Sequence, residues 1–277
     1  MVDEHVQGTP GKRLKPYVAF YSGYRQAGLA PARHRGLPSP FLTLIFTMDD
    51  PLVVAAHPDA SQAAGRYDAL VGGLHLTPAI IEHGGRQSGI QVAVNPLGCR
   101  ALLGLPAGEL AGVDVDLAAL VDPASVVAVR DRIGSAATWP ERFAAVDAWL
   151  CRLARDRPGG VHPDVAHVFH RLLRAGGDVP IGMLAGEVGW SARHLTNRFQ
   201  AEVGLRPKEA ARVARFDRAR RRLAPGVRLA DVAAGAGYFD QAHLAREFTA
   251  FAGCSPSRWM AEEIGFVQDQ RLLIGQD

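Results

Sequence analysis

The chain has 277 residues, 48% hydrophobic and 21% charged, and its formal net charge is only +3. This length allows two domains with separate cores, and the composition excludes an intrinsically disordered chain. Its longest apolar runs, such as FLTLIFTM at 41–48, are far shorter than the roughly 18 residues of a spanning helix. Because MVDEHVQGTPGKRLKP at the N-terminus also lacks the apolar core of a secretory signal, we expect a cytoplasmic protein without a membrane segment.

The three cysteines argue against two classes of protein, and the distribution of charge indicates where a charged partner would bind. Cys99, Cys151 and Cys254 are odd in number and form no C-x-x-C pair, which argues against a disulfide framework or a zinc module, so we expect buried thiols. Residues 181–260 contain 13 Lys or Arg and 7 Asp or Glu, a balance of +6, whereas the rest of the chain has a balance of −3. The C-terminal third is therefore where a polyanion would bind.

Short β-type runs, punctuated by Gly, Pro, Asn and Asp, fill the chain up to about residue 97. They predict a mostly antiparallel sheet or barrel. The runs lie at 17–24, 41–48, 52–57, 72–84 and 89–96.

From residue 96 onwards the apolar residues are three and four apart, which predicts helices. In WPERFAAVDAWLCRLARD, at 139–156, Pro140 suits the first helical position because a missing N–H is harmless there. DRPGG at 156–160 is the predicted domain boundary. Beyond it we expect helices at 163–174, 180–188, 191–203, 207–223, 228–235, 240–252 and 256–263.

These patterns predict an α+β protein in three parts. Residues 1–157 form a β-rich, barrel-like sensor or dimerisation domain with flanking helices. Residues 161–264 form an all-α domain, and residues 265–277 form a tail.

Two stretches in the helical part share one skeleton, SARHLTNRFQAEVGLRP at 191–207 and DQAHLAREFTAFAGCSP at 240–256. In each, Leu, Phe, Gly and Pro are separated by 4, 5 and 3 residues, and the second copy lies 49 residues after the first. The matching positions are Leu195, Phe199, Gly204 and Pro207, then Leu244, Phe248, Gly253 and Pro256.

The repeat extends upstream as LAGEVGWS at 184–191 and VAAGAGYFD at 232–240. Each contains a short helix, a glycine turn, an aromatic residue and a capping residue, Ser191 or Asp240. This order predicts two helix-turn-helix units, and the second helix of such a unit fits the DNA major groove. The Leu and Phe should anchor that helix in the core.

With this double unit, residues 163–263 resemble the DNA-binding domain of the AraC/XylS family of bacterial transcription regulators. GYRQAGLAPARHRGLPSPFLTLIF and LGCRALLGLPAGELAG resemble the N-terminal domain of a subgroup of that family. The resemblance implies two recognition helices in successive major-groove segments, and activation or repression of a promoter.

Carried over by position, the resemblance assigns base contacts to Arg193, Thr196 and Asn197 in the first helix and to Gln241, Ala242 and Arg246 in the second. The family often has arginine at the position of Asn197 and a polar residue at that of Ala242. Asparagine suits adenine, and the two arginines suit guanine. Phosphate contacts are expected from Ser191, Arg198 and His243.

Other patterns have plainer interpretations. Gly235 and Gly237 are not a dinucleotide fingerprint, because no strand precedes them and residue 240 is not glycine. His167 and His170 suit helix packing better than a metal site. His75 and His83, with His57, Glu82 or Cys99, are the most tempting metal or catalytic group, but their spacing is not that of a metal motif. For Arg220–Arg222 we expect a solvated face or ion pairs with Asp217 and Asp231.

We therefore expect no catalytic residues, metal or cofactor, and predict a transcription regulator that responds to an unidentified small-molecule effector. Its expected partner is double-stranded promoter DNA, with RNA polymerase and a second copy bound through the N-terminal domain as candidates. The main alternative is an N-terminal enzyme or metal-binding domain fused to a DNA-localising domain. A third is an architectural DNA-binding protein with no effector.

Overall fold

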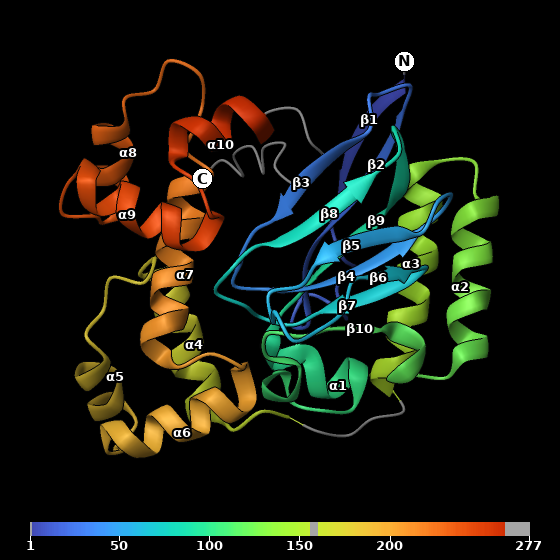
Figure 1. The fold of residues 1–277 in the computed structure, drawn as a ribbon. Coiled ribbons are helices and arrows are strands. Elements are labelled where there is room, and N and C mark those ends of the chain that lie inside the picture. The colour runs from blue at the N-terminus through green and yellow to red at the C-terminus, as the bar shows by residue number, and fades with distance from the viewer. Residues whose placement is uncertain (1, 156–159, 264–277) are drawn as a thin grey trace.

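The computed structural model describes residues 2–155 and 160–263. A β-rich N-terminal part and a helical C-terminal part lie side by side (Figure 1). The predicted boundary at 156–160 falls, except for its last residue, outside the described residues, as does the predicted tail at 265–277. None of the described helices has both the length and the apolar character needed to cross a membrane.

Two antiparallel sheets form the N-terminal part. The six-stranded sheet has the order β1 (Val2–Gly8), β2 (Val18–Ala27), β9 (Arg86–Val94), β4 (Leu42–Thr47), β7 (Ala69–Gly72) and β10 (Asp114–Asp116). The four-stranded sheet has the order β3 (Ala32–Gly36), β8 (Ala79–His83), β5 (Leu52–Ala56) and β6 (Gly65–Tyr67). The predicted β-rich, mostly antiparallel domain is confirmed, and the pairings in the described residues leave two open sheets and not a closed barrel.

Helix α3 (Trp139–Arg155) lies against one face of the six-stranded sheet, with α2 (Pro123–Ser135) outside it (Figure 1). Helix α1 (Cys99–Leu103) lies at the lower end of the sheet in this view. Phe46 of β4 meets Trp149 of α3 edge to face at 5.5 Å, and the Tyr21 hydroxyl donates to Asp147 of α3 at 2.8 Å. α3 begins at Trp139, one residue before the predicted Pro140. Between α1 and α2 lie two 3₁₀ turns, η2 (Ala107–Leu110) and η3 (Leu117–Ala119).

The C-terminal part consists of α4 (Pro163–Arg174), α5 (Ile181–Glu187), α6 (Ala192–Val203), α7 (Pro207–Arg220), α8 (Leu229–Ala236), α9 (Gln241–Ala252) and α10 (Pro256–Glu263). These helices agree with the predicted ones within a residue or two at most ends. α7 runs between the two repeated units, with α6 near one end and α9 near the other (Figure 1).

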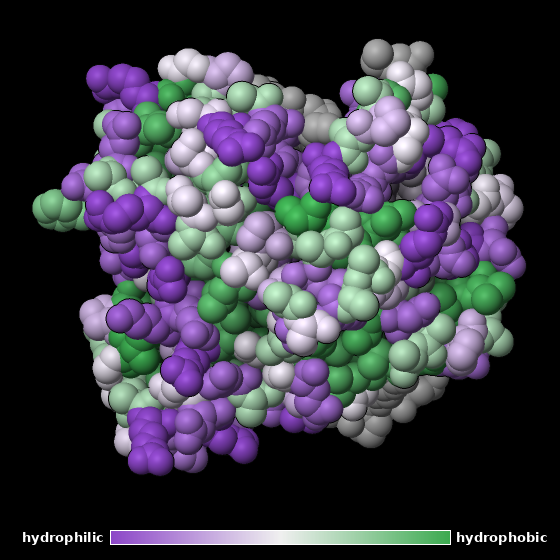
Figure 2. Space-filling model, viewed as in Figure 1, coloured by the Kyte–Doolittle hydropathy of each residue, from purple (hydrophilic) through white to green (hydrophobic). Residues whose placement is uncertain are grey.

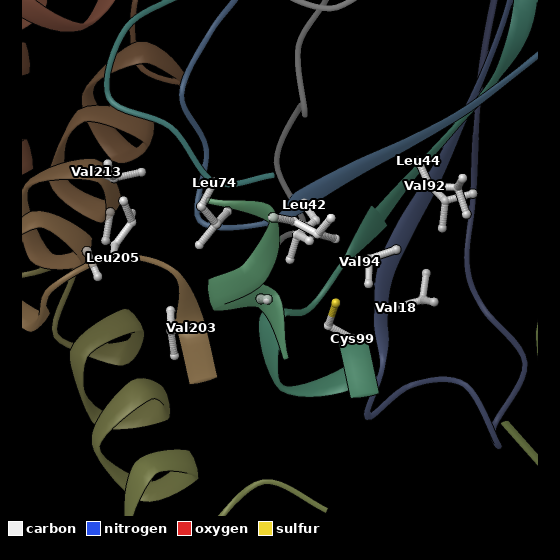
Figure 3. Packing of buried hydrophobic residues seen from close by; sticks show 14 of the residues in the cluster. Val18, Leu42, Leu44, Leu74, Val92, Val94, Cys99, Val203, Leu205 and Val213 are labelled. Carbon is white, nitrogen blue, oxygen red and sulfur yellow. The ribbon is translucent and has the colours of Figure 1, made fainter. Parts of the chain in front are cut away.

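One hydrophobic core crosses from the helical part into the β-rich part. Val203, Leu205 and Val213 approach Leu74 across the boundary, and Cys99, Val94 and Leu44 continue the core beneath the sheet (Figure 3). Of the cysteines predicted to be buried thiols, Cys99 and Cys254 are buried and Cys151 is half-buried, and all three are free. Because the core is shared, the two parts are packed as one body.

Candidate nucleic-acid interface and ligand cavity

The first repeated unit, α5 and α6, is a helix-turn-helix. Its turn is closed by Gly189, whose φ of 68° lies in the left-handed region that glycine tolerates best. The Trp190 amide donates to the Ala185 carbonyl at 3.0 Å, and the Ser191 hydroxyl accepts from the His194 amide at 3.2 Å. Ser191 is therefore the N-cap of α6, as predicted.

The second unit, α8 and α9, repeats this construction. Gly237 has a φ of 83°, and the Tyr238 amide donates to the Ala233 carbonyl at 2.9 Å. The Asp240 carboxylate accepts from the His243 amide at 2.6 Å and caps α9. The four anchors of the repeat, Leu195, Phe199, Leu244 and Phe248, are fully buried. The two-unit prediction is thus confirmed in geometry.

The anchors turn most of the predicted DNA-contacting side chains outwards. Arg193, Asn197, Arg198, Gln241, Ala242, Arg246 and Ser191 are exposed, and Thr196 and His243 are half-buried. The Thr196 hydroxyl donates to the Ala192 carbonyl of its own helix at 2.8 Å, which leaves its methyl group and its lone pairs for a partner. In Figure 2, hydrophilic side chains cover much of the C-terminal helices.

The arginines of α7 divide between two roles. Arg212 pairs with Glu247 of α9 at 2.7 Å, and Arg215 donates to the Gly177 carbonyl at 3.1 Å, so both brace the helical domain. Arg220 and Arg221 pair with the buried Asp217 at 3.1 and 2.7 Å. The expected pairing with Asp217 is confirmed.

Asp231, the other expected partner, pairs with a different arginine. Asp231 is bound instead by Arg228, three residues before it, at 2.8 Å.

A cavity between the two sheets was not predicted from the sequence. It is partly open to solvent, and the volume that the centre of a water molecule can occupy in it is about 100 Å³. One half of its wall is apolar and comes from both sheets: Ile45, Leu52, Val54, Leu70, Ala79 and Ile81. We call this space the inter-sheet cavity.

The register of the six-stranded sheet gives the cavity a polar row as well. Residues paired across neighbouring strands point to the same face of a sheet. One such row consists of Gln7, Ser22, Gln91, Ile45 and Leu70, and the side chains of its first three residues can form hydrogen bonds. The cavity therefore suits a molecule with an apolar body and polar groups.

The helical C-terminal domain also contributes residues to the wall of the inter-sheet cavity. Asp217 and Arg220 of α7, and Arg221 directly after its end, line the same cavity. A more open hollow, with about 300 Å³ accessible to the centre of a water molecule, shares Phe41, Asp217 and Arg221 with it and continues along α7. The two guanidinium groups lie at this end beside Asp217, and the other carboxylate of the lining is Asp114, so these arginines are the groups in the cavity wall that can pair with an anionic group on a bound molecule.

The histidines considered as a metal or catalytic group have separate partners. His57 Nδ1 lies 2.7 Å from the carboxylate of Asp114, and His75 Nδ1 donates to the Thr77 carbonyl at 2.6 Å. His83 lies beside His34, with ring centroids 6.0 Å apart. His167 meets Glu187 at 2.8 Å, in a helix-packing contact. No cluster of three or more metal-ligating side chains occurs among residues 2–155 and 160–263.

Two polar contacts fix the helical domain to the N-terminal part. In the first, which we call the α6 contact, the Arg100 guanidinium donates two hydrogen bonds, of 2.8 and 3.0 Å, to Glu202 near the end of α6. Beside it, Gly108 packs so closely on Ala201 that an added Cβ would lie 2.3 Å from the Ala201 carbonyl oxygen. At Gly108 and Ala201 the backbones of the two domains are therefore in direct contact.

In the second, the α10 contact, Arg35 of β3 binds Glu262 and Glu263 of α10 at 2.9 and 2.5 Å. The Arg35 amide also donates to Glu263 at 3.2 Å. Burial raises the pKa of Glu263, although Arg35 opposes that shift. The α6 contact thus attaches the first helix-turn-helix unit to the N-terminal part, and the α10 contact attaches the helix that follows the second unit.

Comparison with known proteins gives two domain matches. Residues 184–262 match a family described as a helix-turn-helix domain, and residues 7–116 match a domain of unknown function, DUF6597. No curated protein sequence matches the chain.

Among solved structures, ToxT from Vibrio cholerae is similar with a TM-score of 0.53 and 8% identity, over 87% of this chain and 97% of its own. ToxT bound to (E)-4-(8-methylnaphthalen-1-yl)but-3-enoic acid gives 0.53 and 8%, over 87% and 98%. ToxT bound to an unsaturated fatty acid gives 0.52 and 9%, over 89% and 96%. At this identity the likeness shows a common fold.

The double helix-turn-helix geometry, the domain match and the common fold agree with the resemblance found in the repeat. Residues 184–262 are an AraC-type helix-turn-helix domain, and this domain supports the interpretation of the protein as a DNA-binding transcription regulator.

Proposed function

We propose that this regulator reads promoter DNA with α6 and α9, and that a small amphipathic anion in the inter-sheet cavity controls how these helices are presented. The observation that carries the proposal is the composition of the cavity wall. Two sheets of the N-terminal part and α7 of the DNA-binding part line one space. A molecule in that space would touch both domains at once.

For DNA, we propose that Arg193, Thr196 and Asn197 of α6 contact base edges together with Gln241, Ala242 and Arg246 of α9. The positions of these residues support the assignment. They lie at or near the N-terminal ends of α6 and α9, the second helices of the two units, and in this type of unit these ends point towards the bases. Ser191, Arg198 and His243 would contact phosphates and position the helices.

For the effector, we propose a carboxylic acid with an extended apolar body. The apolar wall and the polar row support the body and its hydrogen-bonding groups, and Arg220 and Arg221 support the carboxylate. ToxT, which has the same fold, is described with an unsaturated fatty acid and with an arylbutenoic acid. Both are molecules of this class.

The proposed coupling runs through α7. This helix carries Arg220, and Arg221 directly after its end, at the cavity and packs between the two reading units. Since Asp217 holds both arginines, a carboxylate that recruits them would shift the α7 end relative to the sheets. That shift would act against the α6 and α10 contacts and so change the spacing of α6 and α9.

Binding to an operator tests this proposal. The operator is first selected from a random duplex pool with the full chain, and its affinity is then measured with a long-chain unsaturated fatty acid and with the methyl ester of that acid. We expect the acid, but not the ester, to change operator affinity about tenfold or more, a coupling in the ordinary allosteric range.

Two neighbouring arginines provide matched variants. Arg221→Gln should reduce the effect of the acid severalfold, whereas Arg222→Gln should leave it unchanged, because Arg222 does not line the cavity. An acid effect of equal size in all three proteins would contradict the cavity as its site. Turnover of the acid by the purified chain would favour the alternative of an N-terminal enzyme.

A further inference from the structure

Phe239 is the most exposed large hydrophobic side chain in the described part of the protein. It is 93% exposed, whereas Val127, the next, is 55% exposed. It lies in the α8–α9 turn, directly before Asp240, the N-cap of α9. At the start of a DNA-reading helix, a ring this exposed is available to contact a partner.

Comparison of the two units shows that Phe239 is an extra residue. Trp190 and Tyr238 are equivalent, because each donates its amide to the alanine five residues earlier and each stacks edge to face on a histidine of the next helix. Trp190 is followed at once by its N-cap, Ser191. Between Tyr238 and the N-cap Asp240, the second unit has one more residue, and that residue is Phe239.

The backbone around Phe239 is held on both sides. Tyr238 is buried and bonded to Ala233, and the Phe239 amide donates to His243 Nδ1 at 3.4 Å. The Asp240 carboxylate is bonded to the His243 amide. The turn therefore presents Phe239 from a defined backbone position, and helices α8 and α9, which the turn joins, lie on the side of the molecule away from the sheets (Figure 1).

We propose that Phe239 reads a thymine by contact with its 5-methyl group in the major-groove segment that α9 enters. The inference rests on the proposed DNA-reading role of α9, whose exposed Gln241 and Arg246 supply polar contacts to base edges. The thymine methyl is the apolar feature of a major-groove edge, and aromatic and small apolar side chains recognise it. The first unit lacks the extra residue, so this readout belongs to one half of the operator.

Removal of single methyl groups from DNA tests the proposal. Each thymine of the selected operator is replaced in turn by deoxyuridine, and binding of the full-length wild type, Phe239→Leu and Phe239→Ala is measured. We expect one deoxyuridine in the α9 half-site to weaken wild-type binding about fourfold, the value of one buried methyl group. Phe239→Leu should keep part of that sensitivity, and Phe239→Ala should bind both duplexes equally.

Every outcome of this experiment is informative. If wild type and Phe239→Ala respond equally to every deoxyuridine, the thymine contact is wrong while the DNA-reading role of α9 stands. If Phe239→Ala keeps full affinity and sensitivity but loses activation of RNA polymerase in transcription, the ring contacts protein and the proposal is overturned. If wild type selects no operator, the proposed function fails before the question of Phe239 arises.

Discussion

Arg193 and Arg246 carry the clearest expectations for single residues. Both are exposed on the outward faces of α6 and α9, and neither has an ion-pair partner among the described residues in the structure. If each binds guanine, Arg193→Ala and Arg246→Ala should each weaken operator binding by about 1–3 kcal/mol and relax base choice at one position. Quantitative binding to operators with single base changes measures both effects.

Arg198 is the matched control, because it lies on α6 but is assigned to phosphate. Arg198→Ala should weaken all sequences alike and reduce the salt dependence of binding, with log K against log salt losing a slope of about 1. The same uniform loss in Arg193→Ala would show that Arg193 contacts phosphate.

His34 predicts how the protein responds to acid. It is buried on β3, and burial, with His83 nearby, lowers its pKa to about 4. The unfolded chain takes up this proton near its ordinary pKa of about 6.5, so the stabilisation is fully present above that pH and is lost as the pH falls towards 4. We expect the free energy of unfolding to drop by up to about 3 kcal/mol over this window.

Urea unfolding at several pH values measures that drop, and His34→Leu isolates it. The variant should have a flatter pH profile than the wild type, whatever its stability at neutral pH. Parallel profiles for the two proteins would assign the acid sensitivity to other groups.

At the scale of elements, the helices of the C-terminal part were predictable because local chemistry defines their ends. Ser191 and Asp240 cap α6 and α9, and Gly204 and Gly253 end them in left-handed conformations. The strands lack such signals. β1 reads VDEHVQG and β10 only DVD, so neither has the apolar alternation that identifies a strand, and both form because a neighbouring strand supplies the pairing.

The long predicted strand at 72–84 was wrong for a related reason. Only Ala79–His83 of this run forms a strand, β8 in the four-stranded sheet, whereas Gly72 ends β7 in the other sheet and the residues around His75 form a turn. Sequence alternation does not tell which sheet a strand joins, and for the same reason it could not reveal two open sheets with a cavity between them.

The α6 contact should be energetically coupled across the domain boundary. Since Arg100 is 36% exposed, we expect the double-mutant cycle of Arg100→Gln and Glu202→Gln to give a coupling of about 1 kcal/mol in unfolding free energy. The variants should also respond less to effector. Glu187→Gln removes an ion pair within the helical domain and is the control. A coupling indistinguishable from zero would show that Gly108 and its apolar neighbours hold this contact alone.

At the scale of the whole molecule, the domain order and the DNA-reading units followed from the sequence, but the site that joins them did not. Arg220 and Arg221 looked like part of a solvated run, because nothing local indicates that α7 packs against Phe41 and the cavity of another domain. Such a site exists only once two segments, about 200 residues apart in the chain, meet.

The shared wall of the inter-sheet cavity has one more consequence. If α7 is part of the ligand site, then operator DNA is itself a ligand that acts on the cavity, since binding free energies at coupled sites change each other by the same factor. The regulator would hold its effector with one affinity when free and with another when seated on a promoter. The effector concentration at which the protein responds in a cell would then depend on the number of operators in the genome for each copy of the protein.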